Sequence, residues 1–382
     1  MIRVDIKPEL LQWACQRAGI AADTIIHRFP QFQAWVTKEV QPTLKQVEQF
    51  AKATYTPVGF LFLQEPPVEH VPIPDFRTVA NKKVHRPSPD LLDTIYICQQ
   101  RQDWYRDYAR SIGDAPQPFV GSARVGSEIV ATAKAIRDTL GLNIQERHQI
   151  STFTDALRLF IAQADSIGIL VMCSGVVSSN NRRRLNPDEF RGFAMSDGLA
   201  PLIFINGSDT KSAQMFTLAH ELAHIWLGES AVSDAQASSI TGNEVERWCN
   251  KVAAELLVPI AAFRQEYRKG SALGPELTRL SKRFKVSTLV VLRRIHDVGG
   301  LDEKGFWEAY HAELQRLNSL PKPDGGGDFY LTTAARVSKR FARALIANTL
   351  EGQTLHRDAF RMLGFSKLGT FRELGRGLGV GV

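Results

Sequence analysis

The sequence predicts an α+β protein that is mostly helical. Three observations indicate this fold class: apolar residues recur at helical spacing along most of the chain, one region between residues 168 and 206 is rich in strand-forming residues, and proline- or glycine-rich stretches separate the segments. A chain of 382 residues exceeds one ordinary domain. We expect an all-α N-terminal domain at 1–64, a connector and helix at 65–119, a domain with a small β-sheet at 120–300, and a basic helical C-terminal segment at 301–382.

The composition indicates a globular, cytoplasmic protein without a membrane segment. Hydrophobic residues make up 44% of the chain and charged residues 23%, which suffices to build hydrophobic cores. The first residues turn charged and polar too early for a signal peptide, and the longest apolar runs are far too short to span a membrane. The four cysteines are widely spaced and follow no paired pattern, as expected in a reducing compartment.

The net charge of +7 is unevenly placed. Residues 1–278 carry 29 Lys and Arg against 30 Asp and Glu, whereas residues 279–382 carry 18 against 10. The basic excess therefore belongs to the C-terminal quarter. It favours acidic partners, including nucleic acid, and a solvated basic face is the alternative interpretation.

The first 64 residues predict a series of short helices. Helical spacing and turn signals place them at 8–18, 22–28, 31–38 and 42–53. An apolar run follows at 57–63. Residues 64–90 then contain six prolines, which is typical of an extended connector, and a helix is expected at about 90–111.

The middle of the chain contains the one region that predicts strands. Two helices, at 127–140 and 151–166, precede a β-rich run at 168–173. Residues 190–196 and 202–206 flank the turn signal Asp197-Gly198, which indicates a β-hairpin. We expect the edge of this hairpin to be where an extended peptide could pair.

Helices dominate the remainder. Two long ones are predicted at about 210–227 and 244–257, with more helix to about 297, a flexible link at 321–327 and a last helical segment at 331–378. Residues 358–374 read as two helices around a glycine-containing turn, a helix-turn-helix-like pattern that could contact nucleic acid or an acidic protein.

The stretch that carries chemistry is the helix containing His220, Glu221 and His224. Histidines four residues apart project from one face of a helix, with Cβ atoms about 5–6 Å apart, so both imidazoles can reach one cation. The surrounding helix is apolar nearly all round and should be buried. Two core histidines satisfied by backbone groups are the alternative, but burying these polar groups is costly without a partner such as a metal ion.

A third metal ligand is expected from the next helix. Catalytic zinc sites use three protein ligands and leave one position open, and no third histidine follows His224 closely. Glu246 and Asn250 lie four residues apart beside the apolar stripe of that helix, so Glu246 can reach the metal while Asn250 holds a ligand histidine. The other candidates for the third position are Glu244, Glu255, Glu229 and Asp234. A soft ligand, Cys249, is more simply explained by packing.

These residues predict a metal-dependent peptidase. Zinc is the divalent metal that best suits two imidazoles and a carboxylate, and manganese or iron is also compatible. With a metal in place, Glu221 would accept a proton from water and pass it to the leaving amine.

The sequence around this site resembles the ImmA/IrrE metallopeptidase family. The matching stretches are RGFAMSDG at 191–198, PLIFIN at 201–206, FTLAHELAHIWLG at 216–228 and ERWCNKVAAELLVP at 246–259. The resemblance spans roughly residues 120–297 and implies a zincin-like fold of the gluzincin type, in which Glu246 is the third ligand. It also implies that the protein acts by cleaving a repressor or similar regulatory protein.

Residues 1–64 resemble a lambda-repressor-type (XRE) helix-turn-helix domain, with the best match at Trp35 and at PTLKQVEQFAKA, residues 42–53. The resemblance implies DNA binding, a homodimer on paired half-sites, and a role at a phage, mobile-element or toxin–antitoxin locus. Gln31, Gln33 and Lys38 are the expected DNA contacts. However, residues 1–64 hold only 7 Lys and Arg against 5 Asp and Glu, so a module for dimerisation or partner docking is the alternative.

The leading hypothesis is a site-specific metalloprotease that regulates transcription by cutting a partner protein. The rival hypothesis is a DNA-binding regulator or antitoxin-like protein whose metal site is structural or rarely active. The intact Glu221 favours the enzyme, because a structural site would not need that carboxylate. A nonspecific degradative protease is disfavoured, because it would be harmful in the cytoplasm.

Overall fold

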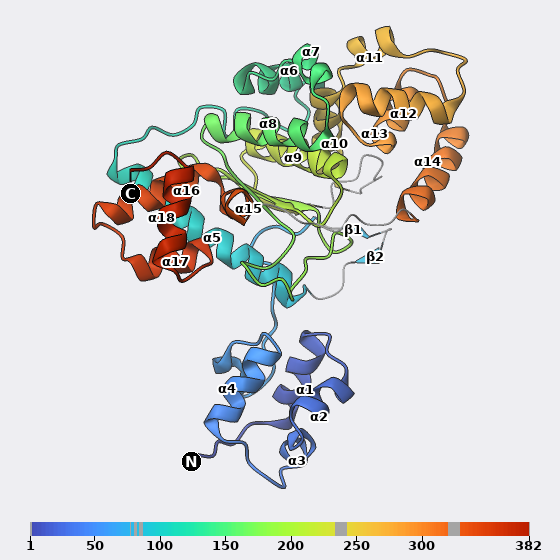
Figure 1. Ribbon diagram of the computed structural model, residues 1–382. Helices are drawn as coiled ribbons and strands as arrows, with labels where there is room; N and C mark the ends of the chain where they lie inside the picture. The colour runs from blue at the N-terminus through green and yellow to red at the C-terminus, as the bar shows by residue number, and fades with distance from the viewer. Residues whose placement is uncertain are drawn as a thin grey trace. The chain divides into compact units, whose positions relative to one another are not determined.

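The chain forms two compact units. A computed structural model describes residues 2–76, 78–79, 82–83, 87–233, 243–319 and 329–381 (Figure 1). The smaller unit comprises Met1–Pro72 and Val84–Ile95, and the larger comprises Ile73–Lys83 and Tyr96–Val382. The predicted α+β class with a helical majority is confirmed. No helix among the described residues is both long and apolar enough to cross a membrane.

The smaller unit is built from short helices around an aromatic core. Its elements are α1 (Pro8–Arg17), α2 (Ala22–Arg28), α3 (Phe32–Val36), α4 (Leu44–Ala53) and the 3-10 helix η1 (Val58–Phe62). Phe50 lies at the centre, 5.6 Å from the ring of Phe32 and 6.4 Å from that of Trp35. A capping box between Thr43 and Gln46 begins α4. The predicted helix at 31–38 is shorter than expected, since α3 ends at Val36 and Lys38 turns the chain with a φ of 62°.

The larger unit contains a four-stranded mixed sheet. Its strands are β3 (Leu170–Ser174), β4 (Gly192–Met195), β5 (Leu202–Asn206) and β6 (Ala231–Ser233), in the order β3-β5-β4-β6. The β3–β5 pair is parallel and the others are antiparallel. A separate two-residue pair, β1 (Thr78–Val79) and β2 (Lys82–Lys83), lies in the connector.

The predicted hairpin exists, but the prediction that its edge is free to pair with a peptide is wrong. Strand β4 is hydrogen-bonded on its outer side to β6, and β5 is hydrogen-bonded to β3. The outer strands of the sheet are therefore β3 and β6. The hairpin pattern could not reveal this, because β6 has only three residues. It begins at Ala231, 25 positions after β5 ends at Asn206.

The helices from the connector to residue 318 are α5 (Pro89–Ser111), α6 (Ile129–Leu140), α7 (Ile144–Gln149), α8 (Phe153–Ser166), α9 (Lys211–Leu227), α10 (Glu244–Leu257), α11 (Ile260–Glu266), α12 (Leu273–Phe284), α13 (Thr288–Asp297) and α14 (Glu303–Asn318). Of these, α8 and α9 pack against the sheet (Figure 1). Helix α9 packs against β4 and β5 on one side and against α8 and α10 on the other. This sandwiched position explains why α9 is apolar nearly all round.

The C-terminal helices pack beside β3. They are α15 (Phe329–Val337), α16 (Lys339–Leu350), α17 (His356–Leu363) and α18 (Leu368–Gly377), and α15 and α16 contact β3. The predicted link at 321–327 lies outside the described residues. Gly364, with a φ of +80°, ends α17 at the predicted turn.

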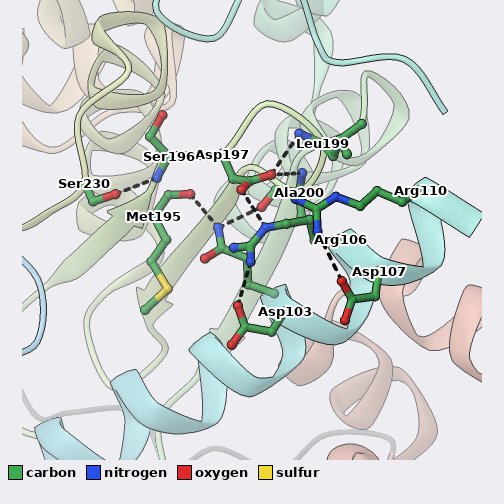
Figure 2. A network of polar contacts seen from close by, with 11 residues as sticks. Asp103, Arg106, Asp107, Arg110, Met195, Ser196, Asp197, Leu199, Ala200 and Ser230 are labelled. Carbon is green, nitrogen blue, oxygen red and sulfur yellow. Dashed lines mark hydrogen bonds and ion pairs between the residues drawn. The ribbon is translucent and has the colours of Figure 1, made fainter.

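A polar network fastens α5 to the β4–β5 turn (Figure 2). Arg106 on α5 forms an ion pair of 2.7 Å with Asp197, whose other oxygen accepts the backbone N–H groups of Leu199 and Ala200 at 2.9 Å. Next to this turn, the N–H of Ser196 donates to Ser230, which directly precedes β6. The network therefore fixes one end of both β4 and β6.

Candidate metal centre

Helix α9 buries the first part of the site. Its N-terminus is capped by the Thr210 hydroxyl, and Gly228 ends it with a φ of +74°. Every residue from 214 to 226 is buried, and His220, Glu221 and His224 are each 0% exposed. The sheet below and α10 beside α9 therefore exclude bulk water from these three polar side chains.

Helix α10 brings Glu246 to the two histidines. Asn243 caps α10 through the Val245 N–H, so Glu246 lies in the first turn and faces α9, with 1% of its surface exposed. One Glu246 oxygen lies 3.2 Å from His220 Nε2 and the other lies 3.1 Å from His224 Nε2. The two Nε2 atoms are themselves 3.1 Å apart. Three of the sequence-predicted residues thus form one cluster, which could hold a metal ion.

The spacing of these donor atoms fits a small tetrahedral cation. Ligand atoms about 2.0–2.1 Å from a tetrahedral zinc lie roughly 3.3 Å from one another. Hydrogen bonds alone do not account for the arrangement. A neutral imidazole carries one proton, so two imidazoles and an ionised carboxylate offer two protons for three mutual contacts. A single cation between the three donors satisfies all of them.

The electrostatics of the cluster favour positive charge. Although burial opposes ionisation of Glu246, the two histidines hold its pKa at about 2. Burial likewise opposes a charged His220, but the Glu246 carboxylate outweighs it and the pKa of His220 is raised. A buried carboxylate that stays ionised and an imidazole that attracts a proton are the conditions under which a cation can take the proton's place.

Glu221 is bound to the sheet through one of its carboxylate oxygens. The Ser233 hydroxyl, on β6, donates a hydrogen bond to Glu221 Oε1, and Gly192 on β4 leaves room for this oxygen. Glu221 Oε2 has no hydrogen-bond partner within the described residues. Burial raises the pKa of Glu221 above its ordinary value, although the two histidines and Ser233 oppose this. The carboxylate is therefore held at one oxygen, while the other is buried without a hydrogen-bond partner among the described residues.

Asn250 lies one turn after Glu246 on α10, as the spacing predicts. Among the described residues, the structure does not bring the other candidate ligands named below to the metal cluster. Glu255 pairs with Arg294 at 2.8 Å, Glu244 is exposed, and Asp234 is outside the described residues. Cys249 is buried in the core and burial raises its pKa well above the usual range, which fits packing.

Two residues near the site could not be predicted from the sequence pattern. Ser233 reaches Glu221 only because β6 pairs with β4, and Phe76, from the proline-rich connector, stacks on the ring of His224 with centroids 6.3 Å apart. Both contacts join segments that are distant in the chain, so no local pattern indicates them.

The expected DNA contacts lie in the smaller unit. Gln31, Gln33 and Lys38 are all exposed. Gln31 accepts a hydrogen bond of 3.3 Å from Gln46, and Gln33 lies on α3. Their side chains are therefore accessible to a binding partner.

Comparison with known proteins supports the peptidase interpretation. Residues 164–296 match the model of a peptidase family described as the IrrE N-terminal-like domain. Both metal-cluster helices fall within this match. The similarity is to a metallopeptidase of the ImmA/IrrE type. Residues 337–377, which include α16, α17 and α18, match a domain of unknown function.

A curated relative gives the same result over a shorter stretch. The radiation response metalloprotease IrrE of Deinococcus radiodurans is 34% identical over 91 residues, which are 22% of this chain and 28% of that protein. The chain therefore spans little more than a quarter of the relative's length.

Proposed function

We propose that the protein is a metal-dependent endopeptidase with Glu221 as its catalytic carboxylate. The observation that carries this proposal is the position of Glu221, buried beside the donor cluster with Oε1 bound to Ser233 and Oε2 without a hydrogen-bond partner among the described residues. A site that only stabilised the fold would need the three donors but not this carboxylate.

His220, His224 and Glu246 would hold the metal, and Asn250 would orient His220. Zinc is the metal expected from this donor set, and manganese or iron also suits it. When bound, such a metal polarises a scissile carbonyl and lowers the pKa of water at the site.

The protein's own groups then divide the remaining work. Glu221 Oε2 accepts a proton from the attacking water and later delivers it to the leaving amine, which a carboxylate of raised pKa does efficiently near neutral pH. Ser233 keeps Oε1 fixed, so the same oxygen always faces the reacting atoms. The buried walls of α9 and the sheet limit bulk water and strengthen these interactions.

Substitution of Glu221 by Gln tests the proposal. We expect one metal ion per chain to be retained while peptide hydrolysis falls by about 10²–10⁴-fold, because the isosteric amide cannot accept the proton. His220→Ala and Glu246→Ala should lose the metal, whereas Glu244→Gln, an exposed neighbour on the same helix, should change neither metal content nor rate. Cleavage by Glu221→Gln at the wild-type rate would contradict this role.

We further propose that the smaller unit is an XRE-type module that directs the peptidase to a regulatory target, as a DNA-bound homodimer. The exposed Gln31, Gln33 and Lys38 support DNA contact, and the substrate would be a repressor or similar regulator. A regulator or antitoxin-like protein with a structural metal site is the alternative. Mobility shifts on the promoter region of its own gene should disappear when the three residues are replaced by Ala, and a shift that persists would contradict DNA contact through them. If Glu221→Gln keeps the full regulatory effect, the alternative is correct.

A further inference from the structure

The outer side of β6 is paired with a segment of the connector. The N–H of Val232 donates to the carbonyl of Pro74, and the N–H of Phe76 donates to the carbonyl of Val232, both at 2.9 Å. Asp75 lies opposite Val232 in a parallel bridge. Residues 74–76 therefore extend the sheet by one short strand, next to β6.

This added strand runs directly over the candidate metal centre. The residue after Val232 is Ser233, which holds Glu221, and the Phe76 ring stacks on His224 with the planes inclined at 29°. The backbone contacts thus lie next to the residue that holds the Glu221 carboxylate, and the ring contact is made with His224, a candidate metal ligand.

The edge of β6 has the properties of a peptide-binding strand. An outer strand presents N–H and C=O groups that an extended peptide can pair with, while pockets for its side chains give specificity. The sheet has two outer strands, and β3 is the one packed beside α15. Strand β6 is the one that contacts Glu221.

Two backbone hydrogen bonds join the segment to Val232. Proline has no N–H, so Pro74 contributes only its carbonyl. Phe76 is only half-buried. A peptide that brings the same backbone groups and an aromatic side chain could therefore replace it.

We propose that the β6 edge binds extended peptides with an aromatic side chain against His224, and that Pro74–Phe76 is an internal occupant which such a peptide must displace. The biological role of this binding rests on the proposed peptidase function, but the binding itself can be tested without hydrolysis. The fraction of molecules with a vacated edge sets the apparent affinity for a peptide in trans, so weakening the occupant strengthens peptide binding.

A binding assay on the full chain tests this without turnover. The probe is a fluorescein-labelled peptide with the sequence of residues 70–76, HVPIPDF, and all proteins carry Glu221→Gln. We expect Phe76→Ala to bind the probe about tenfold more tightly than the parent, because the internal occupant loses its ring contact. Val68→Ala, at an exposed position of the same connector, should leave the affinity unchanged.

Hydrogen exchange supplies a second readout at the edge itself. The Val232 amide should be protected in the parent, exchange faster in Phe76→Ala, and regain protection when the probe saturates that variant. The proposal would be overturned if the parent and Phe76→Ala bound the probe with equal affinity. It would also be overturned if the substitution did not change the exchange rate of the Val232 amide. Since both measurements are independent of hydrolysis, failure of the peptidase proposal would show only in the Glu221→Gln rate comparison.

Discussion

Glu221 is positioned by contacts from three separate elements. Its own helix, α9, places it beside the histidines, the Ser233 hydroxyl on β6 binds one carboxylate oxygen, and Gly192 on β4 leaves the space which that oxygen occupies. An added Cβ at Gly192 would lie 3.2 Å from Glu221 Oε1 and 2.6 Å from Thr217 Cγ2. The glycine is therefore required by the close approach of α9 to the sheet.

Gly192→Ala should damage both stability and activity. The new methyl group also meets the Phe204 carbonyl at 2.8 Å, a backbone atom that cannot rotate away. We expect the free energy of unfolding to fall by about 1–3 kcal/mol and peptide hydrolysis to fall because Glu221 is displaced. Gly198→Ala, whose nearest contact would be an ordinary 3.4 Å to Pro116, serves as the control in urea unfolding and rate measurements. Equal effects of the two substitutions would argue against this packing explanation.

His148 should make folding sensitive to acid. Neither ring nitrogen has a hydrogen-bond partner among the described residues, and the ring packs edge-on against Phe284. Burial, with the charges of Arg283 and Arg147, lowers the pKa of His148 to about 4. Below pH 6.5 the unfolded chain binds a proton that the folded chain binds only near pH 4, so stability is present above pH 6.5 and is lost as the pH falls toward 4.

The size of this effect can be isolated by His148→Phe, which keeps an aromatic ring against Phe284. Allowing for solvent screening, we expect the free energy of unfolding of the wild type to fall by about 1 kcal/mol more than that of the variant between pH 7 and pH 5. Urea unfolding of both proteins at the two pH values, with metal chelated throughout, gives the difference directly. Identical losses would mean that His148 is protonated in the folded protein at pH 5.

At the scale of elements, α5 is fastened to the sheet through Asp197 (Figure 2). This carboxylate accepts two backbone N–H groups and pairs with Arg106, which is 25% exposed. Asp197→Ala should therefore lower the free energy of unfolding by about 2 kcal/mol, because it leaves partly buried donors without an acceptor. Asp107→Ala removes a solvent-exposed pair with Arg110 and should cost at most about 0.5 kcal/mol. Chemical denaturation of the two variants checks the contrast, and comparable losses would contradict it.

The elements that the sequence predicted well are those whose causes are local. The His220–His224 spacing and the Glu246–Asn250 spacing each lie within a single helix. The packing of α9 against α10 follows because the buried stripes of the two helices face one another. Hydrophobic periodicity encodes such stripes. For the same reason strands β3 and β5 were located close to their observed bounds.

What the sequence did not predict depends on pairing between distant segments. Strand β6 has three residues, too few for a period-2 pattern, and its place beside β4 is decided by the sheet as a whole. Ser233 and Phe76 gain their positions only through that pairing. The hairpin was assigned the wrong edge because strand order is not visible in alternation along a single strand.

At the scale of the whole molecule, each unit has its own hydrophobic core. In the smaller unit the core runs from Ile6 to Leu61, whereas the core of the larger unit contains α9 and α10, the two helices that supply His220, His224 and Glu246. A ligand that binds only the folded form stabilises the unit that contains its site. The two units are therefore expected to unfold in separate thermal transitions, of which only one responds to metal.

Calorimetry with and without a chelator tests this expectation. At a free metal concentration about 1,000 times the dissociation constant, binding contributes about 4 kcal/mol to the larger unit, so chelation should lower its transition by roughly 10 °C. Phe50→Leu, in the core of the smaller unit, should shift only the other transition and so assign it. His224→Ala should remove the response to the chelator, because it removes one of the three donors. A chelator shift that persists in His224→Ala, or that moves both transitions equally, would place the metal elsewhere than between α9 and α10.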